Sequence, residues 1–201
     1  MEQKSSLDVR RDNRTVKQFE EDIKFATKLE SKCAYFICET LKKMINDVSY
    51  IDNGCDNSGE LIKEYRDFSQ ADFLFTVKDQ TFPLEIKFHS NRFSSMFFKK
   101  CNIDSYIKQN ARIAVVQEEV FYYFHTDAIK YIQKHIPIIK SNNFASGKKA
   151  YEIQISELEI LRKKFDKQII KKIKWDDSVV DEIEKLFKIK QEYNKKKRER
   201  K

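Results

Sequence analysis

The feature that most constrains the fold is a pair of short segments with alternating polarity, "ADFLFTV" at residues 71–77 and "FPLEIKFH" at 82–89, around the turn "KDQT". Alternation with a period of two residues is typical of β-strands, because successive side chains of a strand point to opposite faces. A short polar linker between two such segments predicts an antiparallel hairpin. The chain is therefore expected to contain a sheet that includes this hairpin.

The charged residues of the predicted hairpin fall on one of its faces. Alternation separates Asp72 from Phe73 and Phe75, and it puts Glu85 and Lys87 on a shared face. Pairing would then bring two carboxylates and an amine together. Mg²⁺ prefers to be held by one or two carboxylates plus water and phosphate, and a metal held in this way can polarise a phosphodiester. The alternative is an exposed acid–base pair across the hairpin, worth ~0.2–1 kcal/mol.

A long amphipathic helix is predicted before the hairpin, over residues 15–46, with apolar residues such as Ile23 and Met44 at three- and four-residue spacing. Position 30 of this apolar stripe is occupied by Glu30. A carboxylate on a buried stripe is unfavourable unless a metal or an ion pair compensates it. Glu39 is the competing acid, but it is expected on a solvated face, so Glu30 is preferred. If the helix is rotated, Glu30 lies only at the rim.

The rest of the chain alternates between predicted strands and helices, which indicates the α/β class with a mixed central sheet flanked by helices. Strands are expected at 48–52, 112–117, 120–125 and 149–155, and helices at 103–111, 126–136, from 156 onward and at 176–200. Residues 1–155 are expected to form the core. Residues 156–201 are expected to be a C-terminal helical extension with a basic tail, either in the same domain or appended to it.

Composition indicates the kind of partner. The chain of 201 residues has 40 Lys and Arg against 32 Asp and Glu, a net charge of +8, which favours an anionic partner such as nucleic acid. Part of this excess is in the tail "KKKRERK", which is otherwise a solvated helix end. No apolar run approaches the roughly 20 residues that span a bilayer, so a cytoplasmic protein without a membrane partner is expected. Four cysteines without a CxxC pair favour free thiols, and no organic cofactor is expected.

The acidic helix followed by "ADFLF", a turn and "PLEIKFH" resembles the core of the PD-(D/E)xK nuclease superfamily over roughly residues 15–135. The motif residues are Ala71-Asp72, Glu85-Ile86-Lys87 and, on the helix, Glu30 or Glu39. Ala71 stands where the motif's name has proline, and this change leaves the acid in place. The resemblance implies a restriction-endonuclease-like core. In it, Asp72, Glu85 and Glu30 would hold Mg²⁺, with Mn²⁺ as a substitute, and Lys87 would help to activate water.

Two further features are assigned to the site or to its substrate. Some branches of the superfamily have a glutamine on the helix after the Glu-x-Lys strand, which would be Gln109 here; a surface glutamine is the alternative. The segment "HSNRFSSMFFKK" at 89–100 mixes basic and aromatic residues. Arg92, Lys99 and Lys100 are predicted to contact the nucleic-acid backbone. In the alternative interpretation, the aromatic residues belong to the hydrophobic core and the basic residues lie at its solvent-exposed rim.

The resemblance implies a Mg²⁺-dependent DNA endonuclease that hydrolyses phosphodiester bonds of double-stranded or branched DNA. A type II restriction endonuclease is preferred because the size fits and the helices after Ser156 could serve dimerisation or base readout. A Holliday-junction resolvase of the RecU-like or archaeal kind is the alternative, and a non-catalytic basic nucleic-acid-binding protein is the further one. Cleavage of both strands at a symmetric site favours a homodimer.

Overall fold

The computed structural model describes residues 15–53, 70–89, 94–141, 149–165, 167 and 169–199. These residues form a six-stranded sheet, a three-stranded sheet and five helices. The elements, in chain order, are α1 (Val16–Met44), β1 (Val48–Asp52), β2 (Phe73–Val77), β3 (Gln80–Phe88), β4 (Ser95–Lys99), α2 (Lys100–Lys108), β5 (Arg112–Val116), β6 (Val120–Phe124), α3 (Thr126–His135), β7 (Ile138–Lys140), β8 (Lys149–Gln154), α4 (Ile155–Lys164), β9 (Ile170–Lys174) and α5 (Asp177–Glu199).

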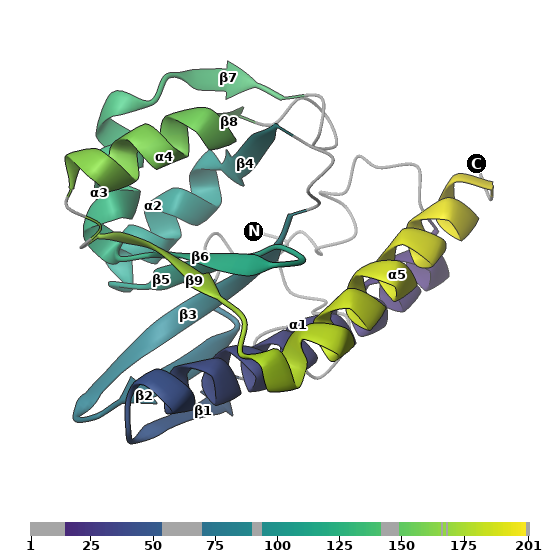
Figure 1. The fold of residues 1–201 in the computed structure, drawn as a ribbon. Helices are drawn as coiled ribbons and strands as arrows, with labels where there is room; N and C mark the ends of the chain where they lie inside the picture. The colour runs from purple at the N-terminus through teal and green to yellow at the C-terminus, as the bar shows by residue number, and fades with distance from the viewer. Residues whose placement is uncertain are drawn as a thin grey trace, which may run out of the picture.

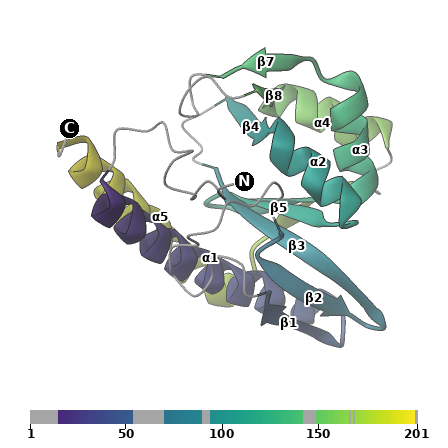
Figure 2. The same ribbon diagram turned by 180° about the vertical axis from the view of Figure 1, so that it is seen from behind.

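The main sheet has the strand order β1-β2-β3-β5-β6-β9, in which β3 and β5 are parallel and all other neighbours are antiparallel. Helices α1 and α5 lie side by side on one face of this sheet (Figures 1 and 2). Helices α2, α3 and α4, together with the small sheet β4-β8-β7, cover the other face. The predicted α/β class is therefore confirmed, with a mixed sheet between helices and a helix at the C-terminal end.

The β2–β3 hairpin has a fixed register. Pairing runs from Phe73 opposite Leu84 to Val77 opposite Gln80, so the turn is two residues long and shorter than the four predicted. Lys78 in this turn has a φ of 54°, the left-handed conformation that tight hairpin turns require. Register decides which side chains meet, because a slip of one residue would move every side chain of a strand to the other face.

Helix α1 begins with a capping box. The Thr15 hydroxyl accepts a hydrogen bond from the Gln18 N–H (3.2 Å), and the Gln18 side chain accepts one from the Thr15 N–H (2.9 Å). Both bonds satisfy N–H groups that the first helical turn leaves unpaired. Cys33 and Ile37 of the predicted stripe are fully buried, whereas Met44 ends the helix and is 63% exposed, so its assignment to the stripe was wrong.

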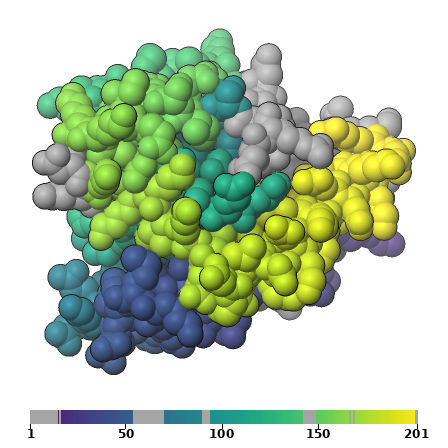
Figure 3. All heavy atoms as spheres, viewed as in Figure 1, coloured from purple at the N-terminus to yellow at the C-terminus, as the bar shows by residue number. Residues whose placement is uncertain are grey.

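The main core lies between the sheet and the pair α1 and α5. Its central residues come from three elements: Leu29, Cys33 and Ile37 on α1, Phe73, Phe75 and Ile86 on the hairpin, and Ile183, Leu186 and Phe187 on α5. Burial of large apolar side chains is the dominant favourable contribution to folding. In the space-filling view α5 (yellow) lies against α1 (purple) along one edge of the molecule (Figure 3). None of the described helices is long and apolar enough to cross a membrane.

Strands β4, β7 and β9 were not predicted. In β4 the residues Met96 and Phe98 are buried in the second core, so the aromatic part of segment 89–100 contributes to packing. Strand β9 has the sequence "IKKIK", in which only Ile170 and Ile173 are buried, and it pairs with β6 at the edge of the main sheet. Residues 156–201 therefore supply a strand of this sheet as well as two helices.

Candidate active site

The carboxylate of Asp72 lies at the open end of the hairpin. Asp72 directly precedes β2, and the register that pairs Phe73 with Leu84 continues to Asp72 opposite Glu85. Residues opposite each other in an antiparallel pair have Cβ atoms about 4.5–5.5 Å apart. The Oδ2 atom of Asp72 accepts a hydrogen bond of 2.9 Å from the N–H of Ile86. The backbone of β3 thereby fixes the Asp72 carboxylate beside Glu85.

Two amide side chains hold the backbone next to Asp72. Gln109 ends α2; its Oε1 accepts a hydrogen bond from the N–H of Ala71 (3.3 Å), and its Nε2 donates to the carbonyl of Ser105 (3.1 Å). The Nδ2 of Asn53 donates to the carbonyl of Ala71 (3.0 Å). Gln109, which the sequence assigned to the site, thus contacts the strand that carries the acid. This hydrogen bond fixes the backbone of the residue before Asp72, and a role of Gln109 in catalysis stays a prediction.

Glu85 has the most unusual environment of the predicted acids. Glu85 is only 3% exposed, and its Oε1 forms an ion pair with the amine of Lys87. Its Oε2 is buried and has no hydrogen-bond partner among the described residues. A buried polar atom without a partner costs about 1–3 kcal/mol. A cation at this oxygen would remove that cost.

The raised pKa of Asp72 also indicates that a positive charge would be favourable at this place. Burial raises the pKa of the Asp72 carboxyl well above its usual range, and the charges of Glu85 and Glu30 raise it further. Lys87 and the Ile86 N–H act in the opposite direction but do not cancel the shift. The acids therefore repel one another, and a bound divalent cation would offset this repulsion.

Lys87 remains protonated in this environment. Partial burial opposes its ammonium charge, but Glu85, Tyr106 and Asp72 outweigh this effect and raise the Lys87 pKa well above its ordinary value. The Lys87 side chain is still 39% exposed. The amine is therefore a permanent positive charge that a substrate can reach.

The structure brings Glu30, and not Glu39, to the hairpin acids. Glu30 acts on the pKa of Asp72 and lines the same pocket as Lys87. Glu39 forms an ion pair of 2.9 Å with Lys42 further along α1. In the described part of the chain, no three His, Cys, Asp or Glu side chains are grouped as a metal site. The donor set that fits a cation is therefore the pair Asp72 and Glu85, which matches the one or two carboxylates with which Mg²⁺ is usually held.

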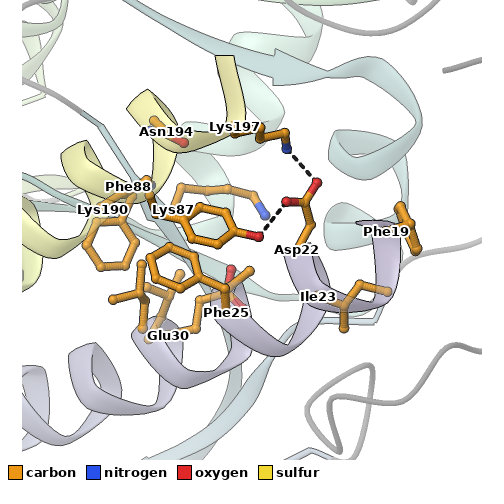
Figure 4. A pocket seen from close by; sticks show the side chains of 14 residues that line it. Phe19, Asp22, Ile23, Phe25, Glu30, Lys87, Phe88, Lys190, Asn194 and Lys197 are labelled. Carbon is orange, nitrogen blue, oxygen red and sulfur yellow. Dashed lines mark hydrogen bonds and ion pairs between the residues drawn. The ribbon is translucent and has the colours of Figure 1, made fainter. Parts of the chain in front are cut away.

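A pocket of about 420 Å³ opens beside Lys87 and Glu30, between α1, the end of β3 and α5 (Figure 4); Asp72 and Glu85 do not line it. Lys87 lies on its β3 side and Glu30 on its α1 side, while Lys190 and Lys197 line it from α5. The ion pair between Lys87 and Glu85 is therefore not sealed from solvent. A phosphate group has room to approach Lys87 from this pocket.

Sequence analysis missed two residues near the acids. Tyr106 of α2 is 1% exposed, and burial raises the pKa of its hydroxyl well above the usual value. The charge of Glu85 and a side-chain hydrogen bond to Glu85 raise this pKa further, while Lys87 acts in the opposite direction. Lys190 is half-buried on α5, where burial lowers its pKa to about 8 although Glu30 partly opposes the shift. A signal for Lys190 exists, because the buried positions Ile183 and Leu186 of α5 lead by helical spacing to position 190.

The other basic and polar candidates have different surroundings. His89 is buried: its Nε2 contacts the Ser95 carbonyl (2.8 Å), and Gln117 donates to its Nδ1 (3.1 Å), so its ring is fixed within the fold. Lys100, the first residue of α2, forms an ion pair with Asp104 one turn further along the helix. Lys99, at the end of β4, is half-buried. Arg92 lies outside the described residues.

Comparison with solved structures found a distant likeness in fold. No family model matches the sequence, and no curated protein is similar to it. Among solved structures, the fold is similar to that of Hjc, a Holliday junction resolvase from the hyperthermophilic archaeon Archaeoglobus fulgidus. The match has a TM-score of 0.41 and 11% identity, and it covers 67% of this chain and 87% of Hjc. At this distance, the function proposed for the chain rests on the geometry of its own residues.

Proposed function

We propose that this chain is a metal-dependent nuclease that hydrolyses phosphodiester bonds in DNA. The observation that carries the proposal is the buried Oε2 of Glu85, which has no hydrogen-bond partner among the described residues and lies beside a second carboxylate, Asp72. A buried acid, Glu85, beside a half-buried acid, Asp72, and an accessible ammonium group is an unfavourable arrangement for a purely structural surface. These groups suit a site that binds a cation and a phosphate together.

Each side chain has a role that follows from its surroundings. Asp72 and Glu85 would hold Mg²⁺, or Mn²⁺ in its place, and Glu30 would add negative charge close by. Bound there, the metal would polarise the phosphodiester and lower the pKa of a water molecule. Lys87 would neutralise charge on the phosphate and orient water. Gln109 would keep the Asp72 strand in place.

The decisive experiment compares Glu85→Gln with the unaltered chain in a plasmid-nicking assay with Mg²⁺. The substitution keeps the shape of the side chain but removes its charge, so cleavage should fall by roughly 10²-fold or more, the scale of losing one electrostatic group in an active site. Glu184→Gln, on the exposed face of α5, is the matched control and should remain active. Lys87→Met should also lose activity.

Two results of the nicking assay would reject the proposal. Nicking that persists in EDTA, or that is the same in Glu85→Gln, would show that these acids do not hold a catalytic metal. DNA binding without any Mg²⁺-dependent cleavage would instead support a non-catalytic nucleic-acid-binding protein. Melting curves of both variants establish that each is folded.

The finer class is tested by the choice of substrate. Digestion of a long duplex and of a four-way junction, side by side, separates the two nuclease alternatives. Discrete fragments with defined ends would support a type II restriction endonuclease. Symmetric nicks at the branch point would support a resolvase. Either activity on both strands of a symmetric site is expected to need a homodimer.

A further inference from the structure

The pocket beside Lys87 is larger than a single phosphate group needs. Its volume of about 420 Å³ lies within the usual range of small-molecule sites, which is about 300–1,000 Å³. Aromatic and aliphatic side chains line much of it: Phe19, Ile23, Phe25, Leu29, Ile86 and Phe88. Figure 4 shows Phe25 and Phe88 close to Lys190 of α5. The pocket therefore offers an apolar surface next to the site where a phosphate would be cleaved.

The polar groups of this pocket come mainly from α5. Asp22 on α1 accepts a hydrogen bond from the hydroxyl of Tyr193 (2.7 Å) and forms an ion pair with Lys197, so the charge of Lys197 is compensated. Lys190 forms no ion pair within the described residues; its amine lies 4.1 Å from the centre of the Phe88 ring. Asn194 lines the same side of the pocket and carries both a donor and an acceptor.

The wall that joins α1 to α5 is well defined. The rings of Phe25 and Tyr193 stack with centroids 3.8 Å apart and an interplanar angle of 8°. Together with the contacts of Asp22, this stack holds the two helices at a fixed separation, so the pocket is part of the fold. Aromatic surfaces, an available cation and an amide are the groups that bind single nucleotides, through stacking, charge and hydrogen bonds to the base edge.

We propose that this pocket binds one unpaired nucleotide of the substrate strand, next to the bond that is cleaved. The inference rests on the proposed nuclease function and narrows its substrate to DNA with a single-stranded nucleotide at the site. A paired base within a duplex is held in the stack, and enzymes that accept a single base in a pocket take it out of the duplex or act on unpaired strands. Lys190 would hold the phosphate of that nucleotide, and Asn194 would contact its base.

The test measures binding in EDTA, with cleavage abolished by Glu85→Gln in every protein used. The probes are a short fluorescein-labelled oligothymidylate and a labelled duplex of the same length, followed by fluorescence anisotropy. Lys190→Met should weaken oligothymidylate binding by about tenfold, with less than about a twofold effect on the duplex. Asn194→Leu should weaken oligothymidylate binding without changing its salt dependence, because no charge is removed.

Lys188→Met is the matched control. Lys188 lies on the same helix, but its side chain is 73% exposed and its only ion pair among the described residues is with Glu184 at 4.0 Å. This variant should bind both probes normally. The proposal is overturned if Lys188→Met and Lys190→Met have equal effects, if single strand and duplex weaken together, or if no variant changes binding. Since this assay contains no metal, its result is independent of the cleavage test on Glu85.

Discussion

At the scale of single residues, the candidate site places the carboxylates of Asp72, Glu85 and Glu30 close together, and their mutual repulsion lowers the stability of the folded state. The sequence could predict that Asp72 and Glu85 lie side by side, because strand alternation is regular and a short turn sets the hairpin register. Their part in catalysis stays a prediction. Glu30 could be preferred over Glu39 because an acid on an apolar stripe is conspicuous. The part played by Gln109 could not be predicted, since its hydrogen bond to Ala71 joins residues 38 positions apart.

The raised pKa of Asp72 predicts a pH-dependent stability cost. The folded state keeps the Asp72 proton to a higher pH than the unfolded state, so stability in EDTA is lost as the pH rises from the unfolded value near 3.8 through the raised folded value. Asp72→Asn removes this cost while keeping the oxygen that accepts the Ile86 N–H. Its Tm should exceed that of the unaltered chain by a margin that grows between pH 4 and pH 8, by about 2–4 °C for each kcal/mol relieved.

Thermal unfolding in EDTA across this pH range checks the prediction. Asp181→Asn, which removes an exposed carboxylate of α5, is the control and should show no trend with pH. Adding Mg²⁺ should reverse the order, because a metal that binds only the folded state stabilises the unaltered chain but not Asp72→Asn. A Tm margin that stays constant with pH would contradict the assigned electrostatics.

At the scale of elements, the helices and the strands with regular patterns were predictable, whereas the short mixed strands were not. The apolar spacing of α1 and the alternation of β2 and β3 depend on local burial alone. Strand β9 has three lysines in five residues, and it is a strand because β6 pairs with it and because Ile170 and Ile173 reach the two cores. That pairing is a tertiary contact, and the composition of β9 does not indicate it.

Helix α5 supplies both core and pocket, so its packing should be essential. Ile183 is fully buried against the α1 side of the core, whereas Ile189 on the same helix is 44% exposed. Ile183→Ala should lower the free energy of unfolding by about 2–5 kcal/mol, because it removes buried methyl groups and leaves a cavity. The same substitution at Ile189 should change it by less than about 0.5 kcal/mol.

Urea unfolding followed by circular dichroism measures both values, and the slope with denaturant should be the same for the two variants. Equal losses at the two positions would show that α5 does not pack on α1 as described. A further consequence concerns the pocket. Because Lys190 and Asn194 are on the next turns of α5, Ile183→Ala should also weaken oligothymidylate binding.

At the scale of the whole molecule, positive charge is concentrated at one end of the chain. The last seven residues contain six basic side chains and one acidic one, so they contribute five of the net charge of +8. The described part of this segment is the last turn of α5, which lies at the rim of the pocket and at the end marked C in Figure 1. Under the proposed function, exposed basic side chains there would contact the phosphates of a strand that enters the site.

This arrangement predicts that the tail contributes affinity without sequence preference. Neutralising the exposed side chains Lys195, Lys196 and Arg198 to glutamine should weaken DNA binding mainly at low salt, and should reduce the salt slope by roughly 0.7–0.9 for each phosphate that the tail no longer neutralises. Lys197 is left unchanged because it pairs with Asp22 in the pocket. Anisotropy titrations over a series of salt concentrations give both quantities.

The control for this prediction is a variant with the same loss of charge on another part of the surface. Neutralising the exposed residues Lys130, Lys134 and Lys163, on α3 and α4, removes three charges on the opposite side of the main sheet from α5 (Figure 1). If net charge alone governs binding, both triple variants will change the salt slope equally, and the tail has no special role. If the tail lies along the bound strand, only its own variant will change the slope, while Mg²⁺-dependent cleavage at saturating DNA stays the same in both, because neither variant alters the acids or Lys87.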